Sequence, residues 1–113
     1  MKISHYSFGR IVVDGRTYNS DVIIYPDRVD PDWWRREGHL LRLEDLKGVL
    51  KSPSRILVIG TGHEGMMKVS SRLAADLEKR GIEVKTAPTP EAVEIFNHLP
   101  DPGVAAAALH LTC

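Results

Sequence analysis

Three glycines in the middle of the chain, Gly60, Gly62 and Gly65, follow the apolar run "RILVIG" with the Gly-x-Gly-x-x-Gly spacing of a phosphate-binding loop. In such a loop, free backbone N–H groups at the start of a helix meet the phosphate. Thr61 and His63 lie within the same segment, and an imidazole that titrates near neutral pH can serve as a general acid or base. These five residues therefore form a candidate site for a small molecule or an anion.

Three features of the sequence weigh against a dinucleotide at this loop. The natural N-cap of the next helix is Ser70, so the positive end of that helix is expected several residues beyond the glycines. The ribose-binding acid, expected about 20 residues on at the end of the next strand, is missing from "VKTA", and Glu83 comes too early. A chain of 113 residues is also too short to hold a six-stranded dinucleotide domain after Gly65. We therefore expect a structural turn and predict no cofactor.

A second candidate is the loop "DWWRREGH", which contains Trp33, Trp34, Arg35 and His39. Two adjacent tryptophans cannot easily both point into one core, so we expect one of them at the surface. Trp and Arg are enriched in the residues that dominate protein interfaces, which makes this loop a candidate partner surface. Stacking of the guanidinium groups on the indole rings is the alternative interpretation.

No sequence pattern indicates a metal site or a catalytic nucleophile. "HEGMM" lacks the second histidine of a helical zinc motif. His110 and Cys113 would face opposite sides of a strand, so they do not form a local pair. His98 is expected at a helix C-terminus, where a histidine interacts favourably with the helix dipole. We predict no metal site and no catalytic residue.

Charge and composition exclude several classes of protein. Fifteen Lys and Arg residues balance fifteen Asp and Glu residues, which argues against a nucleic-acid-binding or anionic-membrane protein. No apolar stretch approaches the roughly 18 residues of a membrane span. The single cysteine, Cys113, excludes an internal disulfide and fits a reducing compartment. A cytoplasmic protein is therefore expected.

The first third of the chain is expected to form strands joined by tight turns, near 2–8, 10–13 and 16–25. The dipeptide Asp14-Gly15 between β-branched runs is a strong hairpin signal. A short helix is predicted at 43–51, where leucines recur on one face.

The second half alternates strand and helix. The run "RILVIG" predicts a buried strand, Ser70 caps a helix that ends at Lys-Arg-Gly, and "IEVKTA" predicts the next strand. Thr89 as N-cap with Pro90 at the first helical position begins a second helix. The ending "VAAAALHLTC" could be helical, but a strand completes a β-α-β-α-β unit with crossovers of suitable length. The prediction is therefore a single compact α/β domain over 1–113, with a mixed sheet, a βαβαβ C-terminal half and a hairpin-rich N-terminal part.

The order of "YSFGRIVVDGRTYNSDVIIYPD", "ILVIGTGHEGMMKVS", "GIEV", "TPEAVEIFNHL" and "AAALHLTC" resembles MTH-type domains of unknown function. That family includes the adipogenesis-associated MTH-domain-containing protein and, more distantly, the mitochondrial complex I assembly factor three. The resemblance covers nearly the whole chain and implies a compact mixed-sheet α/β domain in which "MKV" is extended. It implies no enzymatic activity, and the assembly-factor relatives imply protein binding at most.

We therefore expect a non-catalytic binding or assembly module that engages a protein partner or a second copy of itself. The expected surface joins the loop of Trp33 to His39 with the turn of Gly60 to Gly65. The alternative is a small-molecule or anion-binding protein, or an enzyme, that uses the glycine loop with His63 as acid or base. A third possibility is a structural subunit that buries a large apolar face in an oligomer.

Overall fold

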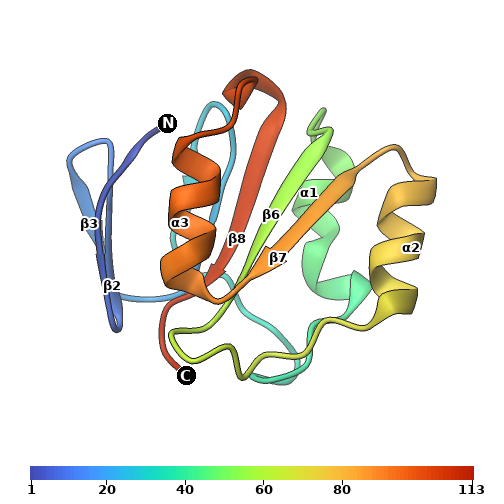
Figure 1. The fold of residues 1–113 in the computed structure, drawn as a ribbon, viewed down its shortest axis with the longest axis horizontal. Coiled ribbons are helices and arrows are strands. Elements are labelled where there is room, and N and C mark those ends of the chain that lie inside the picture. Colours follow the sequence, from blue (N-terminus) through green and yellow to red (C-terminus); the bar gives the residue numbers. More distant parts are fainter.

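The computed structural model describes residues 1–113, which form one compact α/β domain with two β-sheets (Figure 1). The smaller sheet is antiparallel and contains β1 (Ile3–Ser7), β2 (Arg10–Val13) and β3 (Arg16–Tyr18). The larger sheet is mixed and has the order β5-β4-β8-β6-β7. Its strands are β4 (Val22–Ile24), β5 (Val29–Asp30), β6 (Ile56–Thr61), β7 (Glu83–Ala87) and β8 (Ala105–His110).

The N-terminal hairpin forms where the sequence predicts it. Asp14 and Gly15 have φ values of 48° and 80°, so both occupy the left-handed region that a tight two-residue turn requires. The predicted strand at 16–25 is wrong, because it divides into β3 and β4, which pair in different sheets. The division falls at the polar residues before Val22, where Asp21 turns its carboxylate inward to accept the amide of Leu111 at 2.7 Å.

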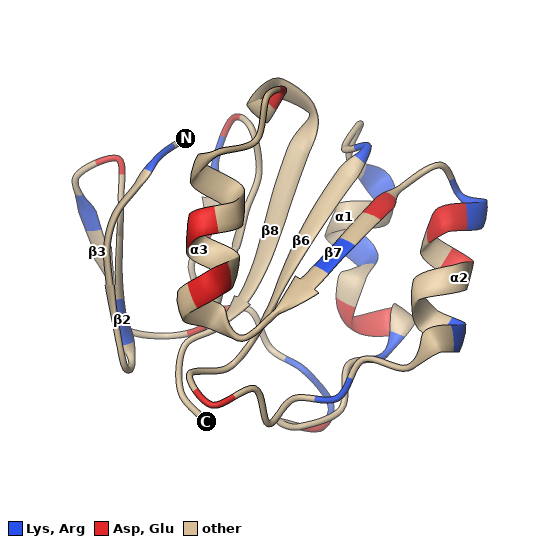
Figure 2. Ribbon diagram, viewed as in Figure 1, with Lys and Arg blue, Asp and Glu red and all other residues tan.

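The C-terminal half is the predicted β-α-β-α-β unit. The helices are α2 (Ser71–Lys79) and α3 (Thr89–Asn97), and β6 pairs in parallel with both β7 and β8. The alanine-rich ending forms β8, a central strand in which all six residues are buried. Its small side chains let layers on both faces of the sheet approach closely. Figure 2 shows that β6 and β8 carry no charged residue, whereas the edge strand β7 carries both signs.

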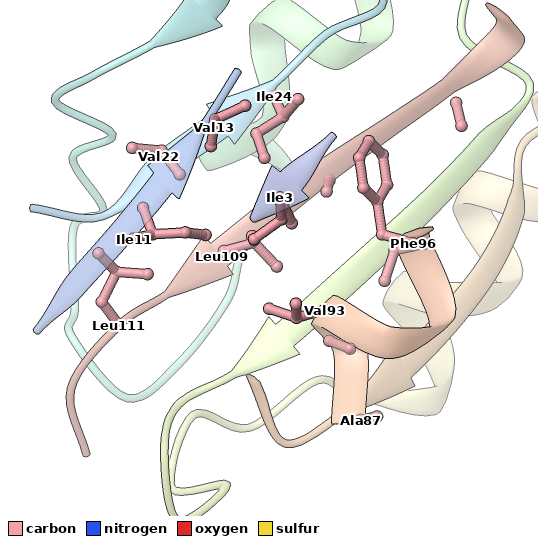
Figure 3. Close-up of a cluster of buried hydrophobic side chains, with 14 residues drawn as sticks. Ile3, Ile11, Val13, Val22, Ile24, Ala87, Val93, Phe96, Leu109 and Leu111 are labelled. Atoms are coloured by element: carbon pink, nitrogen blue, oxygen red, sulfur yellow. The ribbon is translucent and has the colours of Figure 1, made fainter. Parts of the chain in front are cut away.

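The large sheet lies between two apolar layers, because its central strands alternate their side chains between the faces. Val58, Ala107 and Leu109 point to the face covered by α3 and by the small sheet. Figure 3 shows this core, to which Phe96 of α3, Ile11 of β2 and Leu109 of β8 all contribute. Leu57 and Ile59 belong to the opposite core, which contains residues of α2 and of the 43–51 segment.

Two predicted helix starts have different outcomes. Ser70 is the N-cap of α2, and its hydroxyl accepts the amide of Leu73 at 3.1 Å, which confirms the prediction. The prediction of Thr89 as N-cap is wrong by one residue: Pro88 occupies that position, and Thr89 and Pro90 are the first two helical residues. The Thr89 hydroxyl faces the sheet instead, where it donates to the carbonyl of His110 at 2.6 Å.

The predicted helix at 43–51 begins as a 3-10 helix, η1 (Leu43–Leu46), and continues as the short helix α1 (Lys47–Lys51). A second 3-10 turn, η2 (Pro102–Val104), leads into β8. None of the helices has both the length and the apolar character needed to cross a membrane.

Candidate functional site

The glycine turn follows β6 directly and is tied to the end of the chain. The amide of Gly62 donates to the Thr89 hydroxyl at 2.9 Å, and the amide of His63 donates to the carbonyl of Thr112 at 2.7 Å. The amide of Gly65 donates back to Gly62 at 3.1 Å. Three backbone donors of the turn therefore have acceptors within the chain. Gly62 has a φ of 108° and packs so closely that a Cβ atom there would collide with the carbonyl group of Cys113.

The helix that follows does not begin at the glycines. The intervening residues are not helical: the Met67 amide donates to the carbonyl of Thr61, and the Lys68 amide donates to the carbonyl of His39 at 2.8 Å. Since α2 begins only at Ser71, its positive end lies beyond the turn, as the position of Ser70 predicts. Lys68 also forms a parallel bridge with Leu40, which brings the segment after the turn beside the tryptophan loop.

His63 projects from this turn against two aromatic residues of the hairpin. Its Nδ1 lies 3.1 Å from the Tyr6 hydroxyl, and its ring meets that of Phe8 edge-on. The Tyr6 hydroxyl donates its only proton to the carbonyl of Leu111 at 3.0 Å, so Nδ1 of His63 is the donor in the Tyr6 contact. Burial, together with the negative charge of Asp21, raises the pKa of Tyr6 above its ordinary value.

A buried ionic cluster lies on the other side of Leu111. One oxygen of Asp21 lies 2.8 Å from a guanidinium nitrogen of Arg35 and 2.8 Å from Nδ1 of His110. Arg35 and His110 are 9% and 6% exposed. Burial raises the pKa of Asp21, but hydrogen bonds from His110, the Leu111 amide and Arg35 outweigh burial, and the pKa lies below its ordinary value. The cluster joins the tryptophan loop to β8 and to the start of β4.

The tryptophan loop alternates buried and exposed side chains. Trp33 is 7% exposed and donates its indole N–H to the carbonyl of Asp45 at 2.8 Å, whereas Trp34 is 76% exposed. The pair is therefore divided between core and surface, as the sequence predicts. Arg35 stacks its guanidinium group over the Trp33 ring at 4.6 Å. The side chain of His39 is exposed, and its ring lies 6.0 Å from that of His110 at the end of β8.

A groove of about 530 Å³ lies beside the exposed Trp34, between β4, β5 and the 43–51 segment. Its apolar walls are Ile23, Tyr25 and the two tryptophans, and its charged rim includes Arg36, Glu44 and Lys47.

The fold brings the predicted residues to the end of the large sheet where β6 and β8 finish, but some of their side chains are buried and others are exposed. Trp33 and Arg35 are buried anchors, while Trp34, His39 and His63 reach the surface. Sequence reasoning missed Asp21 and Tyr6. The only signal for Asp21 is that it directly precedes the β-branched run that begins at Val22, and Tyr6 has no signal in its strand. No group of three or more His, Cys, Asp or Glu side chains is placed to hold a metal ion.

The architecture defines the class: an α/β domain in which one face of a mixed five-stranded sheet is covered by α3 and a small antiparallel sheet, and the other face by α2 and the 43–51 segment. Residues 3–110 match the model of a family described as a protein of unknown function, DUF498/DUF598. The chain belongs to this family, and the predicted MTH-type resemblance is confirmed.

Solved structures support the same assignment. A conserved hypothetical protein of Pyrococcus horikoshii is 30% identical, with a TM-score of 0.82 and complete coverage of both chains, 100% and 100%. The protein MT938 is 25% identical with a TM-score of 0.75, covering 99% of this chain and 98% of that one. A Mth938-like domain of Bordetella pertussis, 18% identical with a TM-score of 0.73, covers 97% and 85% and shares the fold.

Proposed function

We propose that this protein is a non-catalytic binding module of the cytoplasm that engages a protein partner through the surface around Trp34. The observation that carries the proposal is the position of Trp34. It is 76% exposed, although its neighbours on both sides, Trp33 and Arg35, are buried at 7% and 9%. A large exposed aromatic residue next to an apolar groove is typical of an interface anchor.

Rigidity of the segment supports this proposal. Trp33 is held by the carbonyl of Asp45, Arg35 is held by Asp21, and the backbone amide of Arg36 donates to the Asp45 carboxylate at 3.2 Å. Because these bonds fix the backbone on both sides of Trp34, a partner does not have to order the segment on binding. Such preorganisation lowers the entropic cost of association.

The rim of the groove carries charges of both signs, which supports a protein partner rather than a nucleic acid. Arg36 and Glu44 form an exposed pair at 3.9 Å, and Lys47 and Asp30 also line the groove. Mixed charge around an apolar centre is the composition expected at the rim of a protein interface.

The test compares Trp34→Ala with Phe8→Ala, the other large exposed aromatic side chain, which is 56% exposed and lies in the hairpin. Tagged wild-type protein and the two variants are used to capture partners by crosslinking, with quantification by mass spectrometry. We expect proteins captured by both the wild type and Phe8→Ala to be lost with Trp34→Ala. Equal capture by all three proteins at equal thermal stability would contradict the proposal.

One observation favours the second candidate function, a small-molecule or anion-binding protein or enzyme that uses Gly60, Thr61, Gly62, His63 and Gly65. The contact of 3.1 Å between His63 and the Tyr6 hydroxyl places two titratable groups together beside the turn. Such a pair can exchange protons with a bound molecule.

A thermal-shift screen with phosphate, sulfate and mononucleotides tests this candidate. A ligand at 100 times its Kd adds about 2.7 kcal/mol to the free energy of unfolding, which raises the melting temperature. The control is His63→Ala, which removes the imidazole without disturbing the close contacts of Gly62. A shift that is lost in the variant supports the candidate, and an unchanged melting temperature with every anion contradicts it.

A further inference from the structure

The free edge of β7 lies at the opposite end of the large sheet from the groove beside Trp34. β7 pairs only with β6, so one side of its backbone has no strand beside it. The amide of Glu83 donates to the carbonyl of Arg55 at 2.8 Å, toward β6. Because peptide groups alternate along a strand, those of Val84 and Thr86 point to the free edge. Val84 is half-buried and Thr86 is exposed, so this edge is accessible.

The side chains of β7 are self-complementary. Glu83 and Lys85 lie on the same face of the sheet and contact each other at 3.0 Å, with side chains that are 60% and 39% exposed. Figure 2 shows these opposite charges on β7 at the edge of the sheet. A charged edge strand normally resists pairing with other strands. Here each sign has its opposite two residues away, so an antiparallel copy of the same strand can match both charges.

We propose that β7 pairs antiparallel with β7 of a second copy of this chain, centred on Val84. In this register the two Val84 residues exchange both backbone hydrogen bonds, as directly opposed residues do in an antiparallel pair. Glu83 then lies opposite Lys85 of the second copy, and Lys85 lies opposite its Glu83. These are the non-hydrogen-bonded positions, where side chains come closest. The four charges form an alternating cluster on one face.

The charges favour the register centred on Val84 over the alternative register centred on Lys85. Pairing centred on Lys85 would place the two Lys85 side chains directly opposite each other, and like charges at opposed positions are destabilising. On the other face, the centred register brings the two half-buried Val84 side chains together beside Leu77 and Ile82 of the core. The dimer would join the two large sheets through their β7 strands and leave both Trp34 surfaces free, so the inference is independent of the proposed partner.

Sedimentation velocity over a range of protein concentrations tests the pairing. A single strand pair is a small interface, so we expect a concentration-dependent dimer. Glu83→Lys and Lys85→Glu each place like charges opposite one another, and each should weaken the dimer about tenfold or more. The double variant restores opposite charges and should dimerise like the wild type. Circular dichroism at each concentration confirms that all four proteins are folded.

Amide hydrogen exchange gives a second readout that does not depend on any substitution. The amides of Val84 and Thr86 should exchange fast in dilute protein, and the amide of Val84 should become protected as the concentration rises. A wild-type chain that stays monomeric up to about 1 mM would overturn the inference. So would single variants that dimerise as well as the wild type, or a double variant that does not recover.

Discussion

Close contacts at the end of β6 explain why glycine occupies positions 60 and 62 of the turn. The Thr89 hydroxyl lies between the Gly62 amide and the His110 carbonyl, and it accepts from the first and donates to the second. A side chain at Gly60 would meet Leu109 and Thr89 at 2.8 Å. Gly60 and Gly62 are therefore explained by close packing of backbone and side chains within the chain.

The Thr89 hydroxyl makes a testable prediction about stability. Thr89→Val keeps the shape of the side chain but leaves the buried Gly62 amide without its acceptor, and we expect a loss of about 1–3 kcal/mol in the free energy of unfolding. Urea denaturation measures this loss. The matched control is Thr86→Val, at an exposed position of β7, which should change stability by less than about 0.5 kcal/mol. Equal effects of the two substitutions would show that the bridge contributes little.

At the scale of elements, the ionic cluster holds the tryptophan loop against β4 and β8. Asp21 follows the small sheet, Arg35 lies in the loop and His110 ends β8, so the cluster connects three segments that are distant in sequence. Arg35 also donates to the carbonyl of Gly38 at 3.1 Å, which fixes the C-terminal part of the loop. The rigidity of the backbone around Trp34 depends on these contacts.

Substitution of Asp21 should change both stability and its pH dependence. Asp21→Asn leaves the buried Arg35 without its counter-charge, which should cost about 3 kcal/mol at neutral pH. The folded-state pKa of Asp21 lies below its ordinary value, which is about 3.9 in an unfolded chain. The contribution of the carboxylate is therefore complete above this pH and is lost as the pH falls through the folded-state pKa.

Urea unfolding between about pH 7 and pH 2.5 measures this effect across the range in which an aspartate titrates. The wild-type free energy of unfolding should fall more steeply in acid than that of Asp21→Asn, so the two curves converge. Asp27→Asn is the control, because Asp27 forms only an exposed pair with Arg28. Parallel curves for the wild type and Asp21→Asn would contradict the assigned role.

At the scale of the whole molecule, the small sheet is part of the main core and not an appendage. Ile11 of β2 is fully buried and belongs to the same cluster as Leu109 of β8 and Phe96 of α3 (Figure 3). Trp33 reports on the opposite core, across the large sheet. If the domain unfolds cooperatively, a substitution that destabilises one core should also lower the unfolding midpoint measured in the other core.

Ile11→Ala tests this coupling. Truncation of a buried isoleucine should cost about 2–5 kcal/mol, and the midpoints measured by tryptophan fluorescence and by circular dichroism should fall together. Val12→Ala, at a half-buried position on the other face of β2, is the control and should cost less. If Ile11→Ala lowers the midpoint measured by circular dichroism but leaves the midpoint measured by tryptophan fluorescence at its wild-type value, the two cores unfold separately.

Local pattern determined much of the fold. Asp14-Gly15 specified the hairpin, Ser70 specified the start of α2, and the alternation of elements after Arg55 specified the βαβαβ half, because turn chemistry and periodicity act between near neighbours. The same argument correctly placed the helix start away from the glycines. Local pattern failed at the strand predicted for 16–25, because partners distant in sequence decided where it divides.

Only the tertiary structure decided which polar residues meet. Asp21 and His110 are 89 positions apart, and Tyr6 and His63 are 57 apart. No periodicity relates residues at such separations, so the sequence gives no sign of their contact. The sequence determined that one tryptophan of an adjacent pair must lie outside a core. The choice of Trp34 depended on the carbonyl of Asp45 and the carboxylate of Asp21, which hold Trp33 and Arg35 inside.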